Sequence, residues 1–372
     1  TPDALMVVAI IGAITALAAA ISAVTRNDIK AVLAYSTISQ LGYMIMAIGV
    51  GAHLYAFFHL VTHAMFKACL FLCSGSVIHA MHVSLHHLDD HHTDPQNMNN
   101  MGGLKDKMPV THAAMMISTL AIAGVPFFSG FLSKDGILAG VLSYYHHSHG
   151  WTIILPIAGF GAAMITAFYM FRLMFLTFYG KPKKSEIYSH IHESPMPMTI
   201  PLVVLSLLSI AFVFTLDFNP LHADGWFKHL VGYKQHIFLN MDLVREGIHH
   251  AHDSAMYLSL LVASIGIILS LVFYYFKKVN VEKVAVLFDI VGLYTLSRNK
   301  FYIDKIYNTF IYRPFFKQTK FASLVDWDIY DQKIVDSFGW ITLKLSKIST
   351  VVDYSFLDQR IIDGTSDFIN FF

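Results

Sequence analysis

The apolar residues of this chain gather in seven stretches, most of them about as long as a helix that crosses a lipid bilayer, which needs roughly 20 residues. In chain order the stretches are 4–24, 29–50, 53–81, 108–145, 151–179, 199–215 and 256–276. Shorter segments with more polar and charged residues separate them. The pattern therefore predicts an all-α polytopic membrane protein with seven spans.

The fourth stretch is too long for one straight helix and carries helix-breaking residues at its middle. Pro126 removes a backbone hydrogen bond, and Gly124, Ser129 and Gly130 stand close to it. Unwound backbone persists at membrane depth only where protein or water satisfies its polar groups. We therefore expect one broken transmembrane helix, made of two half-helices joined near 124–133, as in the ion sites of transporters.

Basic residues mark alternate connections between the predicted spans. They follow the first, third, fifth and seventh spans, whereas the short connections 51–52 and 146–150 have none. The residues concerned are Arg26, Lys30, Lys105, Lys107, Lys181, Lys183, Lys184, Lys277 and Lys278. By the positive-inside rule these connections lie in the cytoplasm, and the alternation requires the broken helix to count as one span.

Beyond Lys278 the pattern changes to that of a long amphipathic helix. One apolar stripe recurs at steps of four and three and consists of Ile334, Phe338, Ile341, Leu345, Ile348 and Val352. A helix over 325–372 would be roughly 70 Å long at 1.5 Å per residue. A soluble coiled coil and a peripheral membrane anchor also fit this stripe. Because the last span ends on the basic side, we expect a lateral helix along the cytoplasmic membrane face.

Composition narrows the class of protein further. Hydrophobic residues make up 55% of the chain and charged residues 14%, with a mean hydropathy of +0.53, which excludes an ordinary soluble domain. The net charge of +1, without a dense basic run, argues against a nucleic-acid partner. Cys69 and Cys73 are one helical turn apart, so we expect reduced packing residues. The chain begins at Thr1, without methionine, and we expect it to lack an N-terminal part.

Titratable residues inside the apolar stretches are the candidate functional residues. His59, His63 and Lys67 recur at steps of four and so share one face of a helix. Lys134 and Asp135 follow directly after the break in the fourth stretch. A lysine near the bilayer centre costs about 2.5–3.5 kcal/mol on insertion scales and usually faces a bundle interior or a wet cavity. These groups predict proton transfer within the membrane; structural contacts between helices are the alternative.

Other polar residues have competing interpretations. Lys30 is either a basic anchor at the membrane surface or a relay point that feeds protons from the cytoplasm. The pair His59 and His63 has metal-ligand spacing, but no acidic residue or cysteine completes the set on that face. The loop 83–92 holds histidines and aspartates, and we expect it to be a solvated connector. No motif for a nucleotide, haem or iron–sulfur cluster is present, so we expect no redox cofactor in this chain.

Four segments together resemble one family. They are IKAVLAYSTISQLGY at 29–43, HLVTHAMFKACLFL at 59–72, GGL at 102–104 and AGVPFFSGFLSKD at 123–135. These segments resemble the antiporter-like, proton-pumping membrane subunits of respiratory complex I (NADH:quinone oxidoreductase), which are related to Mrp-type Na⁺/H⁺ antiporter subunits. The motifs lie within the first 148 residues, and the helix pattern extends the resemblance over the whole chain. Lysine rather than glutamate at 134, with the long C-terminal stretch, favours the distal pumping subunit.

The resemblance implies a fold and a set of roles. The fold would be the second inverted repeat of an antiporter-like protein, with a five-helix repeat at 1–180, two further spans at 181–278 and the lateral helix region at 279–372. Lys134 would be the central lysine of a proton channel, with His59, His63, Lys67 and Lys30 on a hydrophilic axis beside it. The first repeat and a final anchoring span of the family are not in this sequence.

The implied function is proton translocation driven by distant quinone reduction, as one subunit of a translocase with no redox chemistry in this chain. NAD, FMN, iron–sulfur clusters and quinone would lie in other subunits, and neighbouring membrane-arm subunits would contact the lateral helix. The expected location is the bacterial inner membrane. Two alternatives remain open: a subunit of an Mrp-type Na⁺/H⁺ antiporter, and a structural scaffold of the membrane arm with a vestigial channel.

Overall fold

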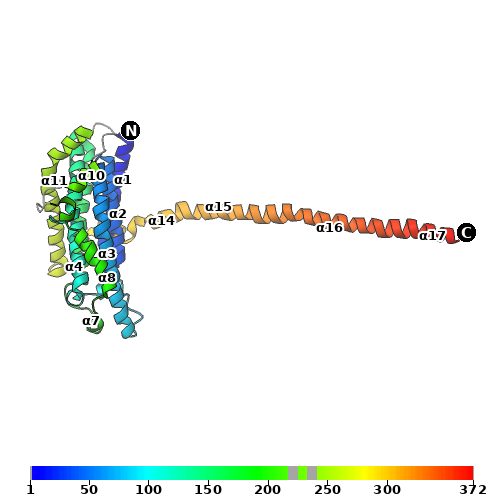
Figure 1. The fold of residues 1–372 in the computed structure, drawn as a ribbon, viewed down its shortest axis with the longest axis horizontal. Helices are drawn as coiled ribbons and strands as arrows, with labels where there is room; N and C mark the ends of the chain where they lie inside the picture. Colours follow the sequence, from blue (N-terminus) through cyan, green and yellow to red (C-terminus); the bar gives the residue numbers. More distant parts are fainter. Residues whose placement is uncertain (1, 217–224, 233–240, 372) are drawn as a thin grey trace. The chain divides into compact units, whose positions relative to one another are not determined.

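The computed structural model describes residues 2–216, 225–232 and 241–371, and within them every regular element is a helix (Figure 1). The chain divides into two compact units, Thr1–Phe301 and Tyr302–Phe372. In the first unit the α-helices are α1 (Pro2–Val24), α2 (Ile29–Gly49), α3 (His53–His87), α4 (Pro109–Ala123), α5 (Ser129–Ser148), α6 (Ile154–Thr177), α7 (Ser185–His190), α8 (Met196–Leu208), α9 (Phe212–Thr215), α10 (Trp226–Gly232), α11 (Met241–Ser270), α12 (Val281–Asp289) and α13 (Leu293–Arg298).

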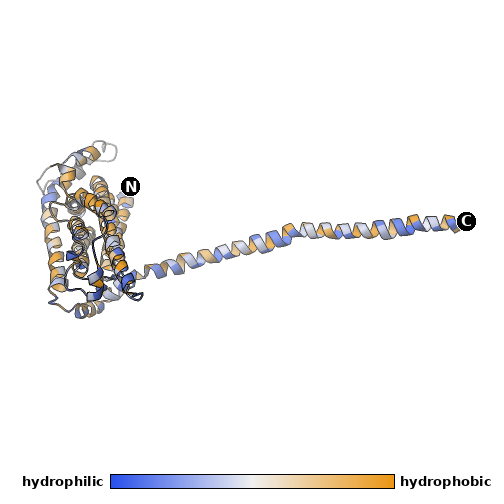
Figure 2. Ribbon diagram, turned by 60° about the horizontal axis from the view of Figure 1, so that its bottom comes forward, coloured by the Kyte–Doolittle hydropathy of each residue, from blue (hydrophilic) through white to orange (hydrophobic). Residues whose placement is uncertain are grey.

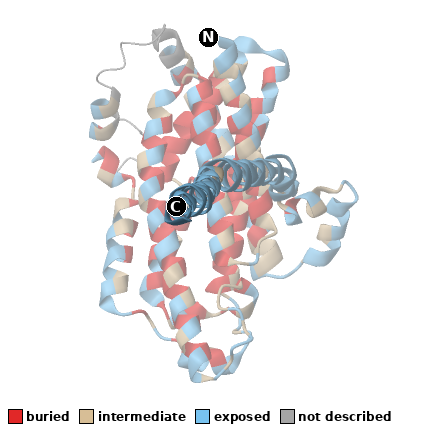
Figure 3. Ribbon diagram, turned by 90° about the vertical axis from the view of Figure 1, so that its right-hand side faces the viewer, coloured by how far each residue is buried: buried red, intermediate tan, exposed pale blue. Residues whose placement is uncertain are grey.

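Five helical segments in the described part of the chain are long and apolar enough to cross a membrane: Pro2–Val24, Ile29–Gly49, His53–His87, Gly150–Thr177 and Glu246–Tyr275. Two shorter apolar helices, α4 and α8, accompany them. Buried residues follow the inward faces of the long helices (Figure 3). The predicted polytopic all-α fold is therefore confirmed, with the seventh span beginning earlier than the apolar run at 256–276 indicated.

The first two helices pack through small residues. A Cβ atom added to Gly12 would lie 2.3 Å from the backbone nitrogen of Met46, and one on Gly42 would lie 2.5 Å from that of Ala16. Such close approach is typical of membrane helices, which gain van der Waals contact where side chains are small. Asp28 then starts α2, because its carboxylate accepts hydrogen bonds from the N–H groups of Lys30 and Ala31.

The break in the fourth span is confirmed and is shorter than predicted. Helix α4 ends where Gly124 takes a left-handed conformation with φ of +77°, and α5 begins at Ser129. Phe127, a non-glycine residue, also has φ of +77°, a conformation that costs free energy for a residue with a side chain. Gly130 lies in the first turn of α5, where an added Cβ would lie 2.0 Å from the Ala121 carbonyl oxygen.

The sixth apolar run, predicted as one segment over 199–215, is also interrupted. Helix α8 ends at Leu208 and the short α9 begins at Phe212. The two interruptions bind each other, since the Ser129 N–H donates to the Ser209 carbonyl and the Ala211 N–H donates to the Phe127 carbonyl, both at 2.9 Å. Backbone groups freed at membrane depth are thus satisfied by a second unwound segment.

Two arginines, Arg26 and Arg172, hold together the segments at the basic end of the first unit, the end that includes the turn between α1 and α2. The buried Arg172 of α6 donates to the Arg26 carbonyl and to Asn27 in the turn between α1 and α2. Arg26 in turn donates to the carbonyls of Ser297 and Arg298, the last groups of α13. A cation at a helix C-terminus satisfies its free carbonyls and complements its dipole. The end of the first unit is therefore held to the α1–α2 turn.

The histidine- and aspartate-rich loop after α3 is ordered by one carboxylate. Asp90 accepts hydrogen bonds from the Thr93 hydroxyl at 2.6 Å and from the Lys184 ammonium at 3.1 Å. These bonds, with those from the backbone N–H groups of Thr93 and His92, hold the pKa of the Asp90 carboxyl below its ordinary value. His92 and neighbouring side chains are exposed, as expected of a solvated connector.

The second unit is a single helical segment from α14 (Ile303–Tyr307) through α15 (Arg313–Ser323) and α16 (Asp336–Thr350) to α17 (Gly364–Phe371), with π-helical turns between them. At 1.5 Å per residue it is roughly 100 Å long. Polar and apolar residues alternate along it (Figure 2), and its large apolar side chains are exposed. The predicted long amphipathic helix is thus confirmed, and it begins well before 325; its place along the membrane face stays a prediction.

Single-cysteine labelling across this helix should show a helical period. We expect low accessibility to a water-soluble reagent at Phe338, Ile341 and Leu345, and high accessibility at Lys344 and Lys347, because a surface helix keeps its apolar stripe away from water. Native Cys69 and Cys73 are fully buried and serve as the unlabelled background. Uniform accessibility along the segment would contradict a lateral helix.

Candidate functional site

The predicted face of α3 lies inside the first unit. His59 is 1% exposed, His63 6% and Lys67 5%. The imidazole of His59 links three helices, with Nδ1 2.8 Å from Ser133 Oγ of α5 and Nε2 3.0 Å from Gln40 Oε1 of α2. Thr62 Oγ1 lies 2.9 Å from the same Ser133 hydroxyl. His59 is therefore hydrogen-bonded through both ring nitrogens.

The next two residues along the face have fewer polar contacts. Among the described protein groups, His63 Nε2 and Lys67 Nζ have no hydrogen-bond partner. The His63 ring meets the Phe66 ring edge-on at 5.4 Å between centroids, and Lys67 Nζ lies 5.8 Å from the Phe71 ring centroid. A buried ammonium without an anion is costly. A charge on Lys67 therefore has no described protein group that stabilises it by a hydrogen bond.

Lys134 lies in the second turn of α5 and points toward the end of α4. It is 3% exposed, and its ammonium donates to the carbonyl of Ile122 at 3.4 Å. That carbonyl is free because the residue four positions later is Pro126, which has no N–H to donate. The negative end of the α4 dipole therefore faces Lys134. Lys134 Nζ also lies 5.2 Å from the Tyr43 ring centroid.

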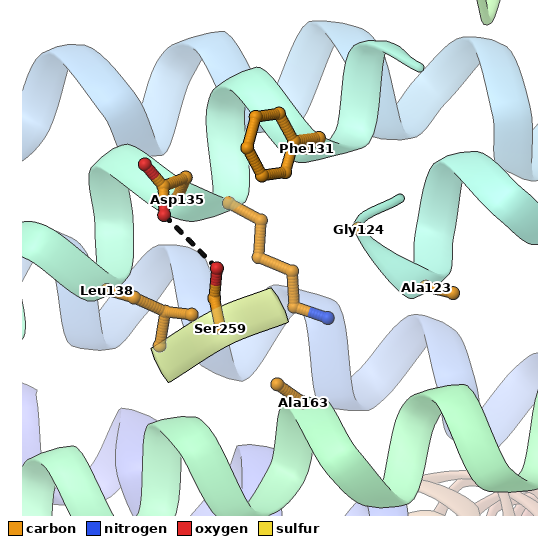
Figure 4. Close-up of a pocket in the computed structure, with 8 residues that line it drawn as sticks. Ala123, Gly124, Phe131, Asp135, Leu138, Ala163 and Ser259 are labelled. Atoms are coloured by element: carbon orange, nitrogen blue, oxygen red, sulfur yellow. Dashed lines mark hydrogen bonds between the residues drawn. The ribbon is translucent and has the colours of Figure 1, made fainter. Parts of the chain in front are cut away.

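The break also creates a small cavity beside this lysine. Its walls come from α4, α5, α6 and α11, and its lining residues are Ala123, Gly124, Phe131, Lys134, Asp135, Leu138, Ala163 and Ser259 (Figure 4). Asp135 accepts a hydrogen bond from Ser259 at 3.2 Å (Figure 4), and its other oxygen lies 3.2 Å from His252 Nδ1. The carboxylate is therefore paired with α11 while it lines the same cavity as Lys134.

The buried groups interact in series along the two helices. His63 lies within electrostatic range of Lys67, and His59 within range of both His63 and Lys134. The centroids of the two imidazole rings are 6.0 Å apart. The structure thus brings His59, His63 and Lys67 of α3 close to Lys134 of α5, and the Ser133 hydroxyl of α5 contacts His59 directly.

Lys30 lies apart from these groups. It is exposed in the first turn of α2, at the basic end of the unit, where its backbone N–H binds the Asp28 cap. Its side chain therefore has the environment of a surface anchor, and its role as an entry point for protons stays a prediction. In the part of the chain that the structure describes, no group of three or more His, Cys, Asp or Glu side chains is arranged for a metal ion.

Sequence reasoning missed three residues of the site. Ser133 bridges His59 and Thr62, yet a serine in an apolar half-helix gave no distinct signal. His252 and Ser259 contact Asp135 from α11, which lies far from it in the sequence. Their helix could have suggested them, because both are polar residues at a spacing of seven and so share one helical face.

Comparison with known proteins gives the family. A family described as NADH:quinone oxidoreductase/Mrp antiporter, transmembrane, matches residues 1–166, which include His59, His63, Lys67, Lys134 and Asp135. The chain belongs to this family. The matching region ends within α6.

Individual relatives extend the similarity beyond the family region. The chain is 34% identical to NADH-quinone oxidoreductase subunit L of Neisseria meningitidis over 90% of its own length and 50% of the relative's. It is 37% identical to F420H2 dehydrogenase subunit L of Methanosarcina mazei, over 83% and 46%. The chain therefore spans about half the length of the curated relatives it matches.

One solved structure shows the same fold. The Mrp complex from Dietzia sp. aligns with 94% of this chain and 34% of the other, with a TM-score of 0.51 and 21% sequence identity. The antiporter-like architecture predicted from the sequence motifs is thereby confirmed.

Proposed function

We propose that this chain is part of a proton-translocating membrane subunit of an NADH:quinone oxidoreductase, and that Lys67, His63, His59, Lys134 and Asp135 carry the proton. The observation that supports this most strongly is a series of buried titratable groups, two of which have no hydrogen-bond partner among the described protein groups. A packed helix interface does not require buried, unpaired charge, whereas a proton carrier must change its charge within the membrane.

The proposed relay works by electrostatic exchange. Two unit charges about 6 Å apart repel by about 3 kcal/mol at an effective dielectric constant of about 20. His63 and Lys67 therefore resist being charged together, and a proton that arrives at one favours loss of the proton from the other. His59 then passes the proton toward α5, where the Ser133 hydroxyl lies 2.8 Å from its ring and Lys134 is the next residue along the helix.

The break in α4–α5 supplies a second position for the proton. The Ile122 carbonyl, left free by Pro126, binds the charged form of Lys134, and the cavity joins that lysine to Asp135. In this proposal, quinone reduction elsewhere in the complex biases which lysine is charged, and the chain itself performs no redox step. NAD, FMN, iron–sulfur clusters and quinone would be held by other subunits.

The proposal covers only the part of the function that two differently named relatives have in common. One is named for NADH and the other for F420H2, and the chain is about equally similar to both. The proposal therefore concerns the membrane part that such complexes have in common. Its partners would be neighbouring membrane-arm subunits along the lateral helix, and its location a bacterial inner membrane.

The purified complete complex, reconstituted in lipid vesicles with NADH and a quinone, tests this function. We expect a pH gradient that a protonophore abolishes and that is unchanged when sodium is replaced by potassium, because lysine and histidine carry protons and no carboxylate-rich sodium site is part of the relay. A gradient of sodium ions that persists with the protonophore present would contradict the proposal and favour the antiporter alternative.

A further inference from the structure

The pair formed by Asp135 and His252 connects the buried site to a more exposed helix. Asp135 is 2% exposed in its side chain and His252 is 29% exposed, with Oδ2 and Nδ1 3.2 Å apart. Ser259 donates a hydrogen bond to the other carboxylate oxygen at 3.2 Å, so both carboxylate oxygens lie close to polar groups of α11. The relay described above ends at Asp135, so this pair is the first contact beyond it.

Polar residues continue along the seam between α5 and α11. The two helices run antiparallel, since Asp135 lies beside His252 while Ser143 and His147, further along α5, lie beside Gly247. A Cβ added to Gly247 would lie 2.5 Å from Ser143 Oγ and 3.1 Å from His147 Cε1, so the helices touch closely there. His147 itself is exposed in the last turn of α5.

The seam leads to the membrane face opposite the basic loops. Helix α5 starts at the break and ends at Ser148, in the connection 146–150, which has no lysine or arginine. By the positive-inside rule that connection lies on the non-cytoplasmic side. Exposure therefore increases from Asp135 through His252 to His147 in the direction in which a pumped proton must leave.

We propose that His252 is the exit residue of this subunit: it receives the proton from Asp135 and releases it to water on the non-cytoplasmic side. This inference rests on the proposed function. Lys134 gives its proton to the Asp135 carboxylate by way of their shared cavity, and the carboxyl O–H then protonates Nδ1 of the neutral imidazole. The imidazolium loses its Nε2 proton to water, and the ring regains its first tautomer by exchange with water before the next proton.

Replacement of His252 separates this role from a structural one. We expect His252→Ala and His252→Gln to lower proton pumping through this subunit, measured with the complete complex in vesicles, by about tenfold or more, within the range for loss of a proton-transfer group. A glutamine amide keeps a polar N–H group near Asp135 but cannot carry a proton. Added imidazole should restore pumping to the alanine variant, because the position is partly exposed. The matched control is His250→Ala, an exposed histidine of the same helix.

Loss in both His252 variants, imidazole rescue of the alanine variant and normal pumping by His250→Ala would support the exit role. Native pumping by His252→Gln, or loss that imidazole does not restore, would overturn it. Lys134→Ala, measured in the same vesicles, tests the proposed function itself: if it pumps normally, the function and the exit both fail, whereas loss there with native His252→Gln overturns the exit alone.

Discussion

Complexes that carry Lys134→Ala are expected to lose proton pumping through this subunit by about 100-fold or more, because removal of a proton-transfer group typically costs about 10²–10⁴ in rate. Lys134 donates a hydrogen bond to the Ile122 carbonyl, lines the cavity and interacts electrostatically with His59 of α3. Its ammonium makes one hydrogen bond to the protein, so we expect the variant to assemble. The measurement is the quinone-coupled pH gradient in vesicles that contain equal amounts of complex.

The control for this variant is Lys105→Ala, which removes an exposed lysine from the basic end of the same unit. We expect it to pump normally, since screened surface charges contribute little. Normal pumping by Lys134→Ala would show that Lys134 is not a proton carrier.

Lys67→Arg should block transport although the positive charge and approximate length are kept. Arginine stays protonated at all accessible pH, so it cannot take part in the exchange with His63. We expect proton transport through this subunit to fall by about tenfold or more, as for the loss of other proton-transfer groups. The assay is again the pH gradient formed during quinone reduction, now recorded over a range of pH.

Lys67→His is the matched variant, because it changes the same site but keeps a group that binds and releases protons. We expect it to retain part of the pumping, with the optimum at lower pH, since imidazole titrates below an alkyl amine. If the arginine variant pumps as well as the native complex, Lys67 is a fixed electrostatic element and the relay along α3 is wrong.

The sequence was sufficient to predict the apolar spans, the break and the buried face of α3, because each depends on local pattern. A four-residue spacing places His59, His63 and Lys67 on one face whatever surrounds the helix. The role of Pro126 follows from the same logic, since it frees the carbonyl four residues before it, and the structure shows Lys134 bound there.

The interruption between α8 and α9 was not predicted because its cause is tertiary. The run 199–215 has no glycine, and its one proline, Pro201, lies inside α8, away from the break. The backbone opens at Ser209 because the unwound segment near Phe127 offers hydrogen bonds in return. The hydropathy pattern cannot predict such hydrogen bonds between segments that are distant in sequence.

The partners of the site depend on packing in the same way. Ser133 and His252 become part of it only because α5 lies between α3 and α11. For Lys30 the sequence pattern suggested more than the structure supports. Its place in a helix rich in polar residues suggested a relay residue, yet its side chain is exposed at the start of α2. Spacing gives the face of a helix but not the neighbour that covers it.

The most direct test of a single relay is the number of protons pumped per electron in complexes with Lys134→Met, which keeps the side-chain volume and removes the charge. This ratio does not depend on the amount of active complex. We predict that the variant loses the share of protons carried by this subunit, and that adding Lys67→Arg lowers the ratio no further, because both residues act in one series. A native ratio in Lys134→Met, or a further loss in the double variant, would contradict the relay.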